Sequence, residues 1–130
     1  MSRVLFYAAV MFLALHGLVH LMGTTVYMRL GRIQGMTYKT TLVGGRWDLG
    51  DNGIAVFGAF LLLAALGFIA ASAGLLAGWN GAASLLAAIS ALSLLLTLLD
   101  WEYAIMGAIV NVVILMVLWI GPRLYTAFLS

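Results

Sequence analysis

Two histidines in the first apolar segment are the side chains whose chemistry is easiest to specify. His16 and His20 are four residues apart, so in a helix both imidazoles lie on one face, about one turn apart. This spacing suits chelation of one metal ion, and His16 and His20 are therefore the predicted metal ligands. The chain has no cysteine, so the candidate ions are divalent zinc, iron or manganese held by nitrogen and oxygen donors.

Four carboxylates could complete such a site or act as acids and bases. Asp48 and Asp51 precede the second apolar segment, and Asp100 and Glu102 separate the third from the fourth. An anion at a helix N-terminus also satisfies free backbone amides. Capping by Asp48 or Asp51 is therefore the alternative interpretation for the first pair, and capping by Glu102 is the alternative for the second.

One amide lies inside an otherwise aliphatic segment, where it needs a hydrogen-bond partner from another helix or from a ligand. This amide joins the predicted ligand-binding residues, which are His16, His20, Asp48, Asp51, Asp100, Glu102 and Asn111. The alternative for the two histidines is that they are neutral and hydrogen-bond within the protein, to backbone, to Asn111 or to the carboxylates.

The composition places these residues in a membrane. The chain is 65% hydrophobic and 8% charged, whereas a soluble domain is about 25% charged. Four apolar segments approach the length needed to cross a bilayer, at residues 4–22, 54–73, 82–99 and 104–120. All four tryptophans lie at the ends of these segments, as in interfacial aromatic belts. We predict an all-α polytopic membrane protein, a single antiparallel four-transmembrane-helix bundle over residues 1–130.

Antiparallel crossings bring the end of the first helix, the start of the second, the end of the third and the start of the fourth to one side. This side, the polar face, would gather all the predicted site residues, with His16 and His20 on the last turns of the first helix. A tight turn is expected at residues 78–81, and Pro122 should end the last helix. Small residues are abundant in the second and third helices, which are expected to pack most closely.

A long basic loop connects the first two helices. Residues 23–47 contain four of the six cationic side chains, Arg29, Arg32, Lys39 and Arg46. In a membrane protein these side chains meet anionic headgroups, so membrane lipids are the expected partners and nucleic acid is not. The segment 26–33 either lies along the membrane surface or covers the polar face as a lid. The charge bias favours a cytoplasmic polar face.

The first helix contains a His-Gly-x-x-His-x-x-Gly pattern, and further matching residues are Trp101, Ala104, Gly107 and Asn111. With these residues most of the chain resembles a group of small four-helix bacterial membrane proteins, sometimes labelled permease-like. More distantly, the layout is similar to DoxX-like membrane proteins, some of which are associated with quinone-linked oxidoreductases. The resemblance implies a bacterial cytoplasmic (inner) membrane. The basic loop from Arg29 to Arg46 departs from the pattern.

Three functions remain open. In the first, His16 and His20 with nearby carboxylates hold a divalent metal, a quinone or a lipid headgroup. Haem is a variant in which only one of these histidines is an axial ligand, because residues one turn apart cannot lie on opposite sides of the iron. The second is a transporter or channel subunit that moves protons or small cations as a homo-oligomer. The third is an accessory subunit of a larger membrane complex. No nucleophilic triad or phosphate-binding loop is evident, so enzyme activity is undecided.

Overall fold

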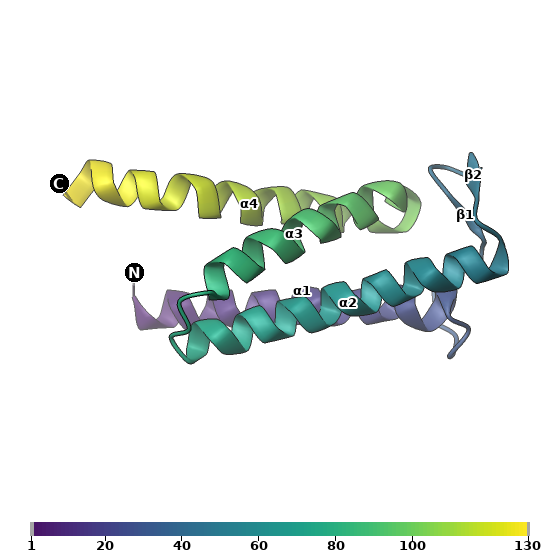
Figure 1. Ribbon diagram of the computed structural model, residues 1–130, viewed down its shortest axis with the longest axis horizontal. Helices are drawn as coiled ribbons and strands as arrows, with labels where there is room; N and C mark the ends of the chain where they lie inside the picture. Colours follow the sequence, from purple (N-terminus) through teal and green to yellow (C-terminus); the bar gives the residue numbers. More distant parts are fainter. Residues whose placement is uncertain (1, 130) are drawn as a thin grey trace.

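The chain folds into a bundle of four helices, seen here in a computed structural model that describes the backbone of residues 2–129 and the side chains of residues 2–123. The helices are α1 (Arg3–Tyr27), α2 (Gly50–Leu76), α3 (Ala82–Leu99) and α4 (Trp101–Leu129). Each is long and apolar enough to cross a membrane, so the predicted all-α membrane bundle is confirmed. The start of α1 and the end of α4 lie at one end of the bundle, and a small hairpin lies at the other (Figure 1).

The helices pack in chain order, α1 on α2, α2 on α3 and α3 on α4, while the backbones of α1 and α4 stay apart and are bridged by the side chains of His16 and Asn111. In Figure 1, α3 crosses between the α1–α2 pair and α4. The most extensive interface joins α1 and α2, so the expectation that α2 and α3 would be the closest pair is wrong. Gly17 explains the close approach, because a Cβ atom at this position would lie 2.6 Å from Cβ of Phe68.

The first helix continues five residues beyond the predicted end at residue 22. Two threonines that follow Gly23 stay helical because their hydroxyls donate to carbonyls one turn back, Thr24 to His20 (3.3 Å) and Thr25 to Leu21 (2.7 Å). His16 therefore lies near the middle of α1, about 16 Å from its end at 1.5 Å per residue. The predicted position of the histidines on the last turns is wrong, and both lie further from the end of the helix.

The fourth helix also differs from the prediction at both ends. It begins at Trp101, but Ala104 has non-helical backbone angles (φ −124°, ψ 17°) and kinks its first turn. Pro122 does not end the helix, which runs on to Leu129. Proline removes one backbone donor, and a membrane helix tolerates this where the freed carbonyl finds another partner.

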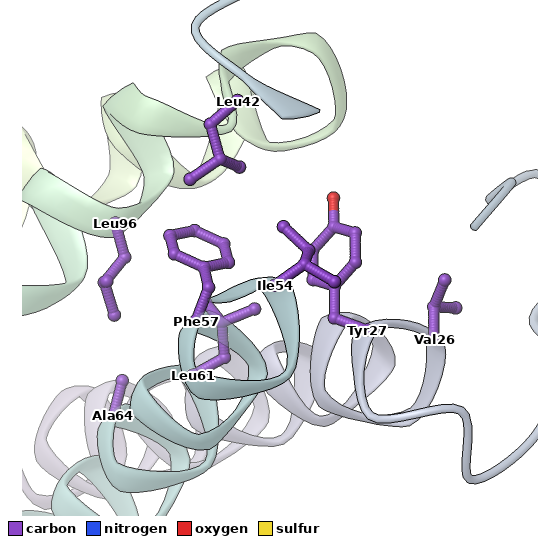
Figure 2. Packing of buried hydrophobic residues seen from close by; sticks show 8 residues of the cluster. All are labelled: Val26, Tyr27, Leu42, Ile54, Phe57, Leu61, Ala64 and Leu96. Carbon is purple, nitrogen blue, oxygen red and sulfur yellow. The ribbon is translucent and has the colours of Figure 1, made fainter. Parts of the chain in front are cut away.

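The loop between α1 and α2 is a folded element with its own anchors. It contains a two-residue hairpin, in which β1 (Thr41–Leu42) pairs antiparallel with β2 (Trp47–Asp48). Leu42 is fully buried and reaches from β1 into the apolar cluster that contains Phe57 and Leu96 (Figure 2). The amide of Val43 donates to the carbonyl of Leu99 at 2.8 Å. The loop is therefore fixed to the end of α3.

Candidate functional site

A group of polar side chains lies inside the bundle, contributed by α1, α3 and α4. We call His16, His20, Ser93, Thr97 and Asn111 the inner polar cluster; each is at most 8% exposed. Nε2 of His16 is 3.0 Å from Oδ1 of Asn111, and Nδ2 of Asn111 donates to Oγ of Ser93 at 2.7 Å. Oγ of Ser93 is 2.6 Å from Nε2 of His20, whose Nδ1 is 2.8 Å from the carbonyl oxygen of His16.

The direction of each hydrogen bond in this cluster follows from the acceptors. A carbonyl oxygen only accepts, so Nδ1 of His20 carries a proton and donates to His16. An amide oxygen likewise only accepts, so Nε2 of His16 is protonated and donates to Asn111. The hydroxyl of Ser93 receives the Asn111 amide and donates to Nε2 of His20. With His20 neutral, its Nε2 accepts this bond, and the four residues form a circuit, closed through the His16 carbonyl, that needs no charge on either imidazole.

The orientation of the Asn111 amide is tied to the charge of His20. If the oxygen and nitrogen of the amide were exchanged, the Ser93 hydroxyl would have to donate to Asn111. Nε2 of His20 would then need its own proton to bond Ser93, and His20 would carry a positive charge. A buried charge without a counter-ion is costly, so the neutral circuit is the favoured arrangement. This arrangement matches the alternative that the histidines hydrogen-bond within the bundle.

Charged side chains lie nearer the end of the bundle, in a second group. We call Tyr27, Lys39, Asp100 and Glu102 the outer charged cluster. The carboxylate of Asp100 is buried (5% exposed), accepts a hydrogen bond from the Tyr27 hydroxyl and is 2.8 Å from Nζ of Lys39. Lys39 also lies 3.3 Å from Glu102. Burial lowers the pKa of Lys39, but the two carboxylates outweigh burial and the net pKa is raised.

A cavity of about 450 Å³ connects the two clusters. His16, His20 and Thr97 line it at depth, and Asp100 and Tyr103 line it near the end of the bundle. Most of the remaining wall is apolar, and the loop contributes residues 34–36. None of residues 26–33, the segment considered as a possible lid, lines this cavity.

The cavity opens between α1 and α4, whose backbones stay apart. Three of its lining residues are also exposed on the outer surface of the helices, Val19 (58%), Met22 (40%) and Met106 (70%). These side chains belong to apolar spans whose outer surface faces lipid. The cavity thus borders the apolar outer surface of the bundle.

Two predicted site residues lie away from the cavity. Asp48 is exposed and accepts hydrogen bonds from the Thr40 hydroxyl (2.8 Å) and the Gly50 amide (3.0 Å), which lower its pKa. The Gly50 amide opens α2, so Asp48 has the capping role. Asp51 is exposed and pairs with Arg29 and with the Tyr38 hydroxyl. Glu102 is at the edge of the outer charged cluster.

The structure gives the metal hypothesis no support. Within residues 2–123, no group of three or more His, Cys, Asp or Glu side chains is placed to hold one ion. Both nitrogens of His20 are already hydrogen-bonded, and Asp48 and Asp51 are too far along the surface to join the histidines. A metal at His16 and His20 would have to break the circuit.

Several residues of the two clusters were not predicted from the sequence. Ser93 and Thr97 of the inner polar cluster are four residues apart on α3, and this polar spacing in an apolar span was a usable signal. Tyr27 and Lys39 carried no such signal. Tyr27 meets Asp100 from the last turn of α1, whereas Lys39 meets it because the loop folds back over the end of α3.

No protein-family model, curated protein sequence or solved structure matches this chain. Its class is therefore defined by its own fold and site. It is an integral membrane protein whose four apolar helices surround a cavity with a neutral polar floor, a charged rim and an apolar side opening.

Proposed function

We propose that this protein binds a neutral amphipathic membrane molecule, such as a quinone or an uncharged lipid headgroup with its chain. The polar head would lie against the inner polar cluster, and the apolar body would leave through the opening between α1 and α4. The observation that carries the proposal is the cavity of about 450 Å³, which joins buried polar groups to the lipid-facing surface. Pockets with apolar walls and a few convergent polar groups are typical of small-molecule sites.

The charge of the ligand follows from the inner polar cluster. Its five side chains are neutral and bonded mainly to one another, so they offer no counter-charge to an ion. Lys39 and Asp100 at the rim already neutralise each other at 2.8 Å. An ion moved from water into this setting would lose hydration without gaining a partner. An uncharged ligand head group with hydroxyl or carbonyl oxygens needs no counter-charge.

Photolabelling in lipid nanodiscs tests the proposal. An azidoquinone and a photoactivatable diacylglycerol serve as probes, and labelled residues are mapped by mass spectrometry. We expect at least one probe to label cavity residues such as Met22, Met106 and Gly107, and excess unlabelled compound to suppress this labelling. Labelling spread over all lipid-facing residues, without competition, would contradict the proposal.

A matched pair of variants locates the site. Val19→Phe adds bulk at the opening, whereas Val56→Phe makes the same change on α2 outside the cavity. The two valines are similarly exposed, at 58% and 56%, so neither change disturbs the core. We expect Val19→Phe to reduce cavity labelling several-fold and Val56→Phe to leave it unchanged. Equal effects would place the binding elsewhere.

The location we propose is a bacterial cytoplasmic membrane, with membrane lipids as the immediate partners. The pattern His-Gly-x-x-His-x-x-Gly in α1 supports this location through its resemblance to small bacterial membrane proteins. Separation of inner and outer membranes from a bacterium that expresses the tagged chain would test it. Recovery in the outer-membrane fraction would contradict it.

A further inference from the structure

Every N–H and O–H donor of the inner polar cluster is already used. His16 donates from Nε2 to Asn111, His20 from Nδ1 to a carbonyl, and Ser93 to His20. Asn111 donates to Ser93 and, at 3.4 Å, to Thr97. The Thr97 hydroxyl donates to the carbonyl of Ser93 at 2.8 Å. A ligand head that reaches this cluster therefore finds no free donor.

One ring nitrogen of the same cluster has no hydrogen-bond partner in the described part of the chain. With its proton on Nε2, His16 has a lone pair on Nδ1, and this atom has no hydrogen-bond partner among the described residues. In the described part of the chain, two side-chain atoms are completely buried and lack a hydrogen bond of acceptable geometry. These atoms are Oγ of Ser90 and Oδ1 of Asp100. Nδ1 of His16 is not one of them, so it keeps some accessible surface. His16 itself lines the cavity.

We infer that the cavity selects a ligand whose polar head carries a hydrogen-bond donor, which Nδ1 of His16 accepts. The ligand class is a neutral amphiphile with a hydroxyl group, such as an alcohol, a phenol or a quinol, in preference to a quinone or an ether. This inference rests on the proposed function and names the chemical class that the same cavity takes. A head with acceptor oxygens alone would face the Nδ1 lone pair without a bond.

The size of the preference follows from one hydrogen bond. A neutral hydrogen bond contributes about 1 kcal/mol net, and a buried acceptor left without its partner costs a similar amount or more. Each 1.4 kcal/mol is a factor of ten in affinity. We therefore expect about a tenfold preference for the donor-bearing member of a matched pair of ligands.

The decisive experiment is a competition between two probes that differ in one methyl group. 4-Dodecylphenol and its methyl ether are titrated against the photolabel in nanodiscs that contain the parent protein. Displacement by the phenol at about tenfold lower concentration supports the inference. Equal displacement by both compounds overturns the inference and leaves the proposed function standing. Cavity labelling that neither compound displaces, and that no excess of the unlabelled photoprobe suppresses, overturns both.

A loop variant separates His16 from one further uncharged polar group that lines the cavity. The side-chain amide of Gln34 lies at the loop end of the cavity and has no hydrogen-bond partner among the described residues. Gln34→Met removes this amide without touching the inner polar cluster. If the preference for the phenol persists in Gln34→Met, Gln34 is excluded as the acceptor, and the assignment to His16 then depends on the ring-nitrogen signals. If it disappears, the assignment to His16 is overturned.

Nitrogen-15 NMR reads the acceptor directly, without any change to the fold. The chain has only two histidines, so histidine labelling gives four ring-nitrogen signals. We expect His16 to be protonated on Nε2 and His20 on Nδ1, and the unprotonated Nδ1 of His16 to shift when the phenol binds. The methyl ether should leave that signal in place. A proton on Nδ1 of His16, or equal shifts with both compounds, would overturn the inference.

Discussion

The inner polar cluster and the outer charged cluster lie in the same bundle but hold their polar groups in different ways. The inner cluster has no charge, and its hydrogen bonds run in one direction around a closed circuit through His16, Asn111, Ser93 and His20. The outer cluster depends on charge, with Lys39 between Asp100 and Glu102. Helices supply the inner cluster, whereas a loop residue is central to the outer one.

Depth in the membrane explains the difference. His16 lies about 16 Å from the end of α1, close to the centre of a hydrocarbon layer about 30 Å thick. An ionised group there has no water, so polar residues survive as neutral groups that satisfy one another. Asp100 is at the end of α3, where Lys39 can approach from the loop and stay 17% exposed. An ion pair is therefore stable near the end of α3, whereas the same pair beside His16 would carry a large desolvation cost.

The largest expected effect is the loss of the buried ion pair. Lys39→Met leaves the carboxylate of Asp100 buried with only the Tyr27 hydroxyl, and should lower the free energy of unfolding by about 3 kcal/mol. Arg29→Met, the matched control in the same loop, breaks the exposed pair with Asp51 and should have little effect. Unfolding in mixed detergent micelles measures both. Equal losses in the two variants would show that burial does not distinguish the pairs.

A smaller loss is expected from the inner polar cluster. Asn111→Leu removes the partner of His16 and one partner of Ser93, and leaves two buried polar groups short of a hydrogen bond. We expect about 2 kcal/mol of destabilisation, since hydrogen bonds between membrane helices are modest. Val113→Leu on the exposed side of α4 is the control, with no change expected. If Asn111→Leu lowered the free energy of unfolding more than Lys39→Met, the inner polar cluster would contribute more stability than the outer charged cluster, contrary to expectation.

Alkaline pH should weaken the outer charged cluster alone. The pKa of Lys39 is raised by Asp100 and Glu102, so its ion pairs contribute fully below the ordinary lysine pKa of about 10.5 and are lost as pH rises through the higher folded value. The difference in unfolding free energy between the parent and Lys39→Met should therefore be constant between about pH 7 and 9 and shrink above about 10.5. A difference that grows with pH would contradict the ion pair.

The smallest effect is expected in acid, at the start of α2. The pKa of Asp48 is lowered by the Gly50 amide and the Thr40 hydroxyl, so its contribution is present above the ordinary aspartate pKa of about 3.8 and is lost as pH falls through the lower folded value. Hydrogen exchange of the Gly50 amide should accelerate relative to a reference amide in that range. In Asp48→Ala the acceleration should be absent. An unchanged exchange ratio in the parent would argue against the capping bond.

Much of the fold was predictable because it depends on local properties of the sequence. The four spans, the turn at residues 78–81 and the all-α class follow from apolar length and from turn residues. The helix ends were predicted wrongly, because Thr24 and Thr25 bond back to carbonyls and extend α1, and because α4 accommodates Pro122. Hydropathy alone does not include such hydrogen bonds.

The candidate site was predictable only in part. Antiparallel topology was sufficient to bring His16, His20 and Asn111 into one bundle. It did not separate the exposed carboxylates Asp48 and Asp51 from the buried Asp100. All three precede or follow apolar helices in the same way, and only the path of the loop determines which of them meets a lysine inside the protein.

The sequence by itself determined that the helices lie in lipid, how many spans there are and which types of polar groups they contain. A chain that is 65% hydrophobic, with four apolar segments, has no lower-energy choice than to hydrogen-bond its backbone in helices and place them in lipid. Tertiary structure decided which polar groups meet. Hydrogen bonds between His16 and Asn111, 95 residues apart, and the cavity beside them depend on how α1 and α4 are spaced by α2 and α3. That spacing is set by side-chain packing across the whole bundle, which no local pattern contains.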